Sequence, residues 1–437
     1  MIRKSGYLLL AILSYGIFEA ILLGYPYYIA LAVILFFVVS SDIILFNRGP
    51  AIDLYNVDTE RIIPGKTSRK FQKVNIEIIF RNKGKKRVYF HYFDTLSDVF
   101  ESSGEYEGFL SLEPGDEVKR HYLIESIAIG KYKIGPVKVY TQDPMKLCLV
   151  EYIIPRIDEV SVAPAISDIH TQRSERLSNF IFYMGVHYSR KVGQGYDFYG
   201  VRQYTESDDF RYVAWNRYGA INGEDLYIKQ MEEEKPIDVI FAMDYSWNVN
   251  QGTAEKRMFD RIVNVVINAS YAILKNHDGV GFMVDSSAHD HFIPPTKSEE
   301  SVKNLEKLVS EIRPDGTFNI LPLMDKLKKK IKKNALIFLI SPFSYPEAFH
   351  GGDPRDYKIG KRVFMFLVDP RDFTESKEDP VYKKLLTSAE IVERGYLNNA
   401  AKFFQSIGLK SSVARENDLL MRIMSEYRYG KMTNEGY

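Results

Sequence analysis

The chain has 437 residues, which is too long for one ordinary hydrophobic core and predicts two or three folding units of roughly 150 residues each. Its 58 basic and 57 acidic residues leave a formal net charge of +1, so the overall charge gives no support for nucleic-acid binding. The one cysteine, Cys148, excludes an internal disulfide and a metal site built from several cysteines.

The N-terminal region, residues 1–48, predicts a transmembrane hairpin. Residues 7–23 and 26–46 are two largely apolar runs, close to the roughly 20 residues needed to cross a bilayer. Basic residues flank the pair while the turn between the runs is uncharged, so the positive-inside rule places both ends in the cytoplasm. We expect a multi-pass protein of the cell membrane with cytoplasmic soluble domains. Glu19 is costly in lipid and leaves a single span as an alternative, and a cleaved signal peptide is a weaker one.

Residues 49–165 predict an antiparallel β-sandwich. Short β-rich runs such as 74–80 and 87–93 are separated by turn signals, among them Asn82-Lys-Gly84. Residues 130–140 alternate basic and apolar side chains, which is typical of a half-buried strand.

Residues 236–430 predict an α/β domain, and residues 166–235 form a connector rich in Gly, Tyr and charge. Apolar strand-like runs alternate with helical patterns, which favours a parallel sheet covered on both faces. The expected strands are 237–243, 280–284, 335–340, 362–368 and 411–414, and the expected helices are 257–275, 301–312, 321–332, 398–407 and 418–427.

The first of these strands ends in oxygen-bearing side chains at alternate positions: Asp244, Ser246 and Asn248. Ligands of open α/β sheets collect at the carboxyl ends of strands, and oxygen ligands suit a hard cation such as Mg²⁺. The alternative is that Asp244 and Ser246 cap the following helix and bind nothing.

Several segments in order resemble one prokaryotic family, domain of unknown function 58, over nearly the whole chain. Residues 130–137 with Asp143-Pro144 resemble the family's closing strands, and residues 195–204 open its connector signature. From the signature we single out Arg202, Asp208, Asp209, Arg211 and Trp215.

The resemblance implies a von Willebrand factor A-like, Rossmann-like domain in the C-terminal half, beside the β-sandwich and the N-terminal two-helix transmembrane hairpin. Members of the family are commonly encoded beside MoxR-type AAA+ ATPases, so the resemblance also implies such an ATPase as a protein partner. An adaptor or assembly factor is therefore expected rather than an enzyme.

The resemblance also implies a metal-ion-dependent adhesion site that would hold Mg²⁺. Asp244 and Ser246 match its first loop, the amide carbonyl of Asn248 can take its third position, and Thr317 matches the second loop. In the third loop Ser341-Pro342 stands where the family tends to have Ser-Asp, which removes an anionic ligand and makes the site degenerate. The alternative for Thr317 is that it opens the next helix.

The connector signature departs from the family pattern, because Ala214 and Ala220 stand where an Asp and an Arg are usual. Its mixture of charges and aromatics fits either a partner-binding groove or an ion-paired belt that locks the connector to the α/β domain.

These observations predict a membrane-anchored cytoplasmic adaptor that binds a protein partner through its α/β domain. A metal-dependent hydrolase is an alternative, and it needs a general base for which Asp285 or Asp315 is available. An outward-facing adhesin is a third interpretation, and it requires the reversed membrane topology.

Overall fold

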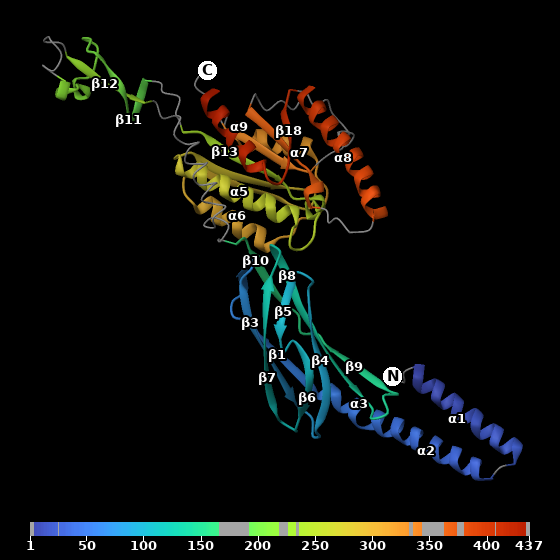
Figure 1. Cartoon of the computed structure of the whole chain (residues 1–437). Coiled ribbons are helices and arrows are strands. Elements are labelled where there is room, and N and C mark those ends of the chain that lie inside the picture. Colours follow the sequence, from blue (N-terminus) through green and yellow to red (C-terminus); the bar gives the residue numbers. More distant parts are fainter. Residues whose placement is uncertain are drawn as a thin grey trace. The chain divides into compact units, whose positions relative to one another are not determined.

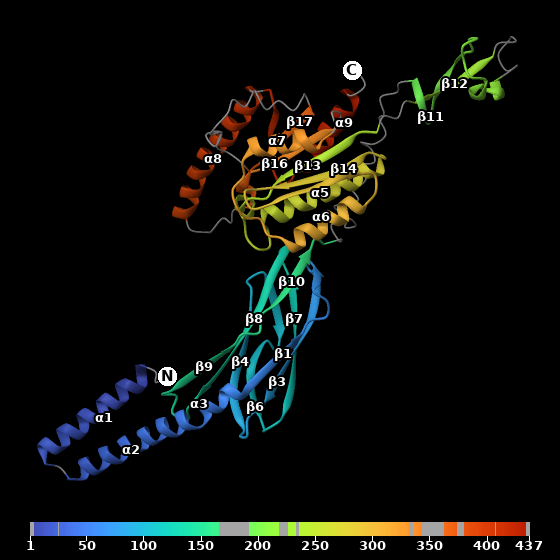
Figure 2. The ribbon, with the colours of Figure 1, turned by 180° about the vertical axis from the view of Figure 1, so that it is seen from behind.

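The computed structural model describes residues 4–24, 26–165, 192–217, 226–232, 236–331, 335–342, 362–373, 380–406 and 408–433. The chain divides into two compact units, Met1–Ala165 with Val309–Ile312, and Ile166–Leu308 with Arg313–Tyr437. The fold is mixed α/β, with several sheets and two apolar N-terminal helices (Figures 1 and 2).

The first unit begins with two apolar helices, α1 (Lys4–Leu23) and α2 (Pro26–Arg48). Within the stretches Gly6–Leu23 and Pro26–Asn56 the mean hydropathy reaches 1.9 and 2.7. By length and composition both helices can cross a membrane. The short helices α3 (Pro50–Asp53) and η1 (Leu54–Asn56) then lead into the first strand.

The rest of the first unit consists of two sheets packed face to face. One sheet has the strand order β1-β3-β7-β5, and the other has the order β2-β10-β8-β4-β6, with β9 paired to β8. Phe80 of β3 contacts Phe90 and Tyr92 of β4 across the interior, with ring centroids 5.8 and 4.6 Å apart. The strands are β1 (Val57–Ile62), β2 (Thr67–Arg69), β3 (Lys73–Asn82), β4 (Val88–Leu96), β5 (Phe100–Gly104), β6 (Glu107–Leu112), β7 (Glu117–Ser126), β8 (Gly130–Gln142), β9 (Leu149–Ile154) and β10 (Asp158–Ala163).

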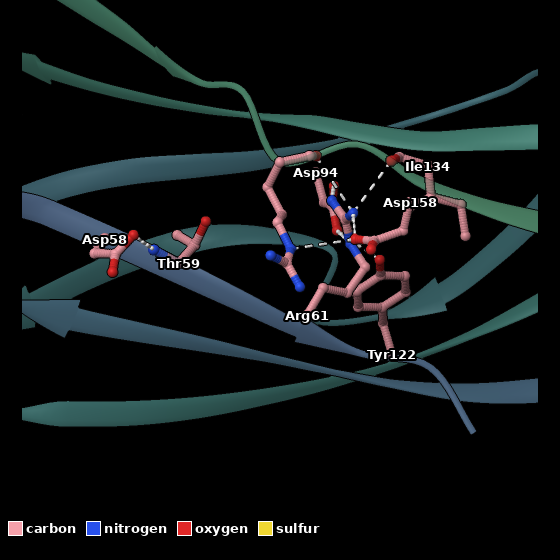
Figure 3. Close-up of polar contacts among 8 residues, drawn as sticks. Asp58, Thr59, Arg61, Asp94, Tyr122, Ile134 and Asp158 are labelled. Carbon is pink, nitrogen blue, oxygen red and sulfur yellow. Dashed lines mark hydrogen bonds and ion pairs between the residues drawn. The ribbon is translucent and has the colours of Figure 1, made fainter. Parts of the chain in front are cut away.

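The sandwich interior holds a buried polar network centred on Arg61 (Figure 3). The Arg61 guanidinium donates to both carboxylate oxygens of Asp94, at 2.9 and 2.5 Å, to Asp158 at 2.7 Å and to the Ile134 carbonyl at 3.1 Å. The Tyr122 hydroxyl donates to Asp94 at 2.6 Å, and burial together with the Asp94 carboxylate raises the pKa of Tyr122. Both charged groups of the central ion pair are therefore satisfied by neighbouring strands.

The second unit contains a six-stranded sheet in the order β15-β14-β13-β16-β17-β18. All pairings are parallel except that of β15 with β14. Every residue of β14, β16 and β17 is buried, as expected for strands covered on both faces. The strands are β13 (Asp238–Asp244), β14 (Gly279–Asp285), β15 (Asp290–Thr296), β16 (Leu336–Ser341), β17 (Val363–Val368) and β18 (Lys410–Ala414).

Helices cover both faces of this sheet. Leu323 of α7 (Ile320–Lys330) and Phe404 of α8 (Pro380–Ser406) share one apolar cluster with Ile337 and Leu339 of β16. On the opposite face, α9 (Leu419–Thr433) contacts Leu336 through the backbone at Gly430. The remaining described helices that follow β13 are η5 (Trp247–Asn250), α5 (Met258–Lys275), α6 (Glu300–Glu311) and η9 (Pro370–Phe373).

Three elements differ from the expectations from sequence. β15 is an antiparallel edge strand where no strand is expected, because its Pro294 and Pro295 hide the β signal and are tolerated only at an edge. α8 begins at Pro380 rather than at residue 398. The connector forms an antiparallel hairpin of β11 (Val192–Gln203) and β12 (Tyr227–Glu232).

Candidate functional site

Four neighbouring strands of the α/β sheet end in oxygen-bearing side chains. Asp285 closes β14, Asp244 closes β13, Ser341 closes β16 and Asp369 follows β17. The register brings them to one edge, because Asp244 lies opposite Asp285 and Ser341 lies opposite Leu367. All four side chains are buried. We call this set the carboxyl-edge row.

Asp244 is the one carboxylate of the row that has no cationic partner among the described residues. Its Oδ1 accepts from the Ser246 backbone N–H at 2.8 Å, and its Oδ2 accepts from the Ser341 hydroxyl at 2.6 Å. Burial raises the pKa of the Asp244 carboxyl; the hydrogen bonds oppose this shift and the nearby Asp285 carboxylate reinforces it. Among the described residues, no Lys or Arg forms an ion pair with Asp244.

Ser246 is fully buried, and its hydroxyl forms no hydrogen bond of acceptable geometry among the described residues, although it lies close enough to the Asp244 carboxylate to lower the pKa of that group. It is the N-cap residue of η5, yet its side chain does not cap that helix. The N-cap of α7 is Asn319, whose side chain accepts from the Leu321 N–H at 3.1 Å, so Thr317 does not cap either. The helix-capping alternative therefore fails for both hydroxyl residues.

The loops that carry the predicted ligands are joined by backbone hydrogen bonds. The Trp247 N–H donates to the Gly316 carbonyl at 3.2 Å, and the Asp315 N–H donates to the Tyr245 carbonyl at 2.9 Å. Gly316 has a φ of 76°, and a Cβ there would lie 2.5 Å from the Ser287 hydroxyl, so this close approach requires glycine.

The predicted ligands lie at different depths of this edge. Asp244 and Ser246 lie below the surface, whereas Asn248 in η5 and Thr317 on the second loop are exposed. The Thr317 N–H donates to the Ser287 hydroxyl at 2.9 Å, which holds the second loop in place. No group of three or more His, Cys, Asp or Glu side chains within the described residues is arranged to hold a metal, so an ion here would need hydroxyl ligands.

The carboxylates on either side have their own cations. Lys326 of α7 approaches Asp285 at 2.5 Å and Asp290 at 3.2 Å, and burial raises the pKa of Asp285 while Lys326 opposes the shift. Arg371 pairs with Asp369 and, against the effect of burial, holds the pKa of Asp369 below its ordinary value. Neither Lys326 nor Asp369 is among the site residues expected from the sequence. Asp369 directly follows an expected strand, the same signal that identified Asp244.

The connector signature forms ion pairs within itself. Arg202 donates to Asp208 at 2.6 Å, and Asp208 also accepts from the Thr205 N–H and hydroxyl at 2.9 and 2.8 Å. Arg202 and Thr205 hold the pKa of Asp208 well below its usual range. Arg211 pairs with Asp209 at 2.7 Å. These pairs join neighbours in the sequence, so none of them links the connector to the α/β domain, as the belt alternative would require.

The same segment exposes aromatic side chains. Phe210 and Tyr212 of η3 (Phe210–Tyr212) and Trp215, which begins η4 (Trp215–Arg217), are 53%, 47% and 57% exposed. The Phe210 ring lies 5.4 Å from that of Tyr204 and 6.0 Å from that of Trp215, measured between centroids. We call these four residues the aromatic cluster of the connector.

Comparison with known proteins gives one family and several distant structures. Residues 200–372 match the family described as "Protein of unknown function DUF58". No curated protein matches the chain.

The structures with similar parts have low TM-scores. An aerotolerance-related membrane protein from Bacteroides fragilis is 14% identical, with a TM-score of 0.28, over 44% of this chain and 99% of that chain. A FixG-related protein from Vibrio parahaemolyticus is 10% identical, with a TM-score of 0.18, over 24% of this chain and 94% of that chain. An alpha-2-macroglobulin from E. coli is 14% identical, with a TM-score of 0.21, over 25% of this chain and 7% of that chain.

Proposed function

We propose that this protein is a membrane-anchored cytoplasmic adaptor or assembly factor that binds a protein partner through a von Willebrand A-like domain. The match to the family of unknown function over residues 200–372 and the two apolar helices support a membrane-associated protein. The parallel sheet with an Asp-x-Ser turn at the end of its central strand β13 supports the von Willebrand A-like assignment.

The observation that carries the proposal is a buried Asp244 carboxylate that only neutral donors hold, beside a buried Ser246 hydroxyl that forms no hydrogen bond among the described residues. A buried carboxylate without a cation and a buried hydroxyl without a partner are both costly unless a ligand completes them. A Mg²⁺ ion would take Asp244 and Ser246 as ligands, with Thr317 and Asn248 supplying oxygens from the exposed loops. When bound, the ion would offer a coordination position to an acidic group of the partner.

Ser341 weakens this site. A carboxylate at that position would add a negative charge, whereas the Ser341 hydroxyl donates to Asp244 and occupies one of its oxygens. We therefore propose weak binding, in the millimolar range of extracellular-type cation sites rather than that of tight buffers.

Thermal unfolding of the full-length protein in detergent tests the ion. Binding to the native state alone raises the midpoint, so millimolar Mg²⁺ should raise that of the wild type and leave that of Asp244→Ala unchanged. Asp278→Ala is the matched control. Asp278 is also fully buried, but it lies far from the carboxyl edge, because it accepts from the N–H of Ile237, the residue before β13 begins. This variant should lose stability yet keep the Mg²⁺ shift. Equal shifts in wild type and Asp244→Ala would remove the metal site.

The aromatic cluster of the connector supports a protein partner, because exposed Trp and Tyr beside Arg are the side chains that dominate binding energy at interfaces. We propose a MoxR-type AAA+ ATPase as the partner. Copurification from solubilised membranes with Mg²⁺ should recover it with the wild type, and Trp215→Ala should reduce recovery by about tenfold or more, the loss expected for a hot-spot residue. Tyr89→Ala, a change at a 48% exposed aromatic of the sandwich, is the matched control and should not reduce it.

A metal-dependent hydrolase is less well supported. Of the two candidate bases, Asp285 is paired with Lys326 at 2.5 Å, and Asp315 accepts from the Gly316 N–H at 2.6 Å. An outward-facing adhesin requires the α/β domain outside the cell. Protease treatment of sealed inside-out vesicles should cleave the domain if it is cytoplasmic and spare it if it faces outward.

A further inference from the structure

The loop between β8 and β9, residues 143–148, packs against the apolar helices. Leu147 and Cys148 belong to one buried cluster with Val39, Ile43 and Phe46 of α2, and Leu9, Leu10 and Leu13 of α1 pack against the same cluster. The carboxyl of Asp42 in α2 also lies near that of Asp143 in the loop. The sandwich is therefore attached to the helical hairpin by a second contact besides the covalent link through α3.

The two helices place this contact at the same depth. At about 1.5 Å per residue, Val39 and Ile43 lie about 14 and 8 Å along the axis from Arg48, the last residue of α2. By the same rise, Leu9 and Leu13 lie about 8 and 14 Å from Lys4, the first residue of α1. If the charged ends of the helices lie at the headgroups, Leu147 and Cys148 pack below them.

The loop is fixed in shape by Asp143. Its carboxylate accepts from the N–H groups of Leu147 and Cys148, at 3.1 and 2.5 Å, and its carbonyl accepts from the Lys146 N–H at 3.0 Å. Lys146 has a φ of 57°, a left-handed conformation that lysine rarely adopts. This turn buries Leu147 against the helices and leaves Met145, which is 44% exposed, and Lys146 on the outer side.

We propose that the 143–148 loop is a membrane-interface element, in which Met145 enters the acyl boundary of an anionic bilayer and Lys146 meets its headgroups. The proposal rests on the membrane anchoring proposed above. We take the bilayer as the surface that the loop contacts because the loop packs directly on α1 and α2, whose exposed apolar side chains contact lipid in a membrane-anchored protein. An exposed Met beside a Lys with a long aliphatic stem matches that boundary.

Ile52 provides a second position at which contact with the bilayer can be tested. Ile52 of α3 is 56% exposed and follows α2 by four residues, so it should lie at the same boundary. Leu123 of β7 lies at the other end of the sandwich. Leu123 pairs with Asn75 of β3. The end of β3 near the helices is Asn82, seven residues further along, which pairs with Val57 at the start of β1.

Fluorescence quenching in vesicles of phosphatidylcholine and phosphatidylglycerol tests the proposal. The acyl chains are brominated near the headgroup end for the Met145, Ile52 and Leu123 variants, and near the methyl end for the Phe37 variant, because Phe37 is the middle residue of α2. Full-length variants Met145→Trp, Ile52→Trp, Phe37→Trp and Leu123→Trp are reconstituted, and the wild-type signal from Trp215 and Trp247 is subtracted. The added indole should lose half or more of its emission in Met145→Trp and Phe37→Trp, a smaller part in Ile52→Trp and less than a tenth in Leu123→Trp.

The outcomes separate this proposal from the anchoring on which it rests. Quenching in Phe37→Trp without quenching in Met145→Trp and Ile52→Trp would overturn the interface element and leave the membrane anchor intact. No quenching in Phe37→Trp would overturn the anchor itself, and the interface element with it. Quenching in Leu123→Trp equal to that in Met145→Trp would also overturn the interface element, because the contact would not be confined to the loop.

Discussion

The two units bury polar groups in opposite ways. In the sandwich, the Arg61 guanidinium is matched by Asp94 and Asp158, and Tyr122 completes the hydrogen bonds of Asp94. At the carboxyl-edge row, Asp244 is held only by neutral donors, and the Ser246 hydroxyl is left without a partner among the described residues. A network whose groups are all satisfied stabilises a fold, whereas a buried group that remains unsatisfied indicates that something else completes it.

Removing polar groups should therefore lower the stability of the protein in the sandwich network and raise it at Asp244 and Ser246. Every polar group removed from the sandwich network leaves a buried partner exposed to an apolar environment. Removing the charge of Asp244 or the hydroxyl of Ser246 relieves a cost that the free protein carries. Proteins commonly accept such a cost at sites that bind ligands.

The largest effect is expected for Arg61→Met. The change leaves the fully buried Asp94 carboxylate without its cation, which should cost the sandwich about 3–5 kcal/mol. Chemical denaturation of the detergent-solubilised protein measures it, with Arg87→Met as a control, since Arg87 is half exposed in its ion pair with Glu113. A loss below about 1 kcal/mol, the level of an exposed ion pair, would show that the network is not what stabilises the sandwich.

A smaller loss is expected for Tyr122→Phe. This substitution removes one hydrogen bond of 2.6 Å to Asp94 but keeps the ring and both bonds from Arg61. The expected cost is about 1–2 kcal/mol. If the double variant Arg61→Met/Tyr122→Phe loses no more stability than Arg61→Met alone, the bonds from Arg61 and Tyr122 to Asp94 act as one network. Full additivity of the two stability losses would contradict that.

Asp244→Asn should raise stability instead. Because burial raises the folded-state pKa of Asp244, the stability that this group contributes is present at low pH and is lost as the pH rises through that pKa. In a chelating buffer, above the shifted pKa, the midpoint of the wild type should therefore fall below that of the variant by about 2–4 °C for each kcal/mol recovered. The two midpoints should converge as the pH falls toward the ordinary pKa of an Asp carboxyl, about 4. A variant that is less stable than the wild type at neutral pH would show that the charged carboxylate is already satisfied.

The smallest effect is expected for Ser246→Ala. Removing a buried hydroxyl that has no partner among the described residues should leave stability in a chelating buffer within about 1 kcal/mol of the wild type, with any change favourable. The matched variant Ser270→Ala removes a buried hydroxyl that donates to the Val266 carbonyl at 2.6 Å, so its cost should be larger than that of Ser246→Ala. Equal costs in the two variants would mean that Ser246 has a structural partner.

The sequence predicts those parts of the fold whose burial pattern is regular. The strands ending at Asp244 and Asp285 and the helix at Met258–Lys275 agree closely with the structure, because continuous apolar runs and helical spacing leave little choice. β15 was missed because prolines at an edge strand resemble a turn. The hairpin of β11 and β12 was missed because its strands carry glycines and charges rather than an alternating pattern.

The sequence indicates which edge of the sheet carries the candidate site, but it does not indicate which carboxylate at that edge lacks a cation. The Asp-x-Ser turn identifies the edge of the sheet, and Gly316 explains why the second loop approaches it. Which carboxylates are neutralised depends on Lys326 and Arg371, one on α7 and the other on η9 after β17. Such pairs are made by the fold, so no local pattern could show that Asp244 alone of the three carboxylates lacks a cation within the described residues.

Electron paramagnetic resonance with Mn²⁺, a hard cation that accepts the same oxygen ligands as Mg²⁺, tests the proposed cation site at Asp244 and Ser246 most directly. Titration of the full-length protein should show one bound Mn²⁺ per chain, displaced by Mg²⁺, in the wild type and in Asp278→Ala, and none in Ser246→Ala or Asp244→Asn. The same stoichiometry in wild type and both edge variants, or no bound Mn²⁺ in the wild type, would contradict a cation site at Asp244 and Ser246.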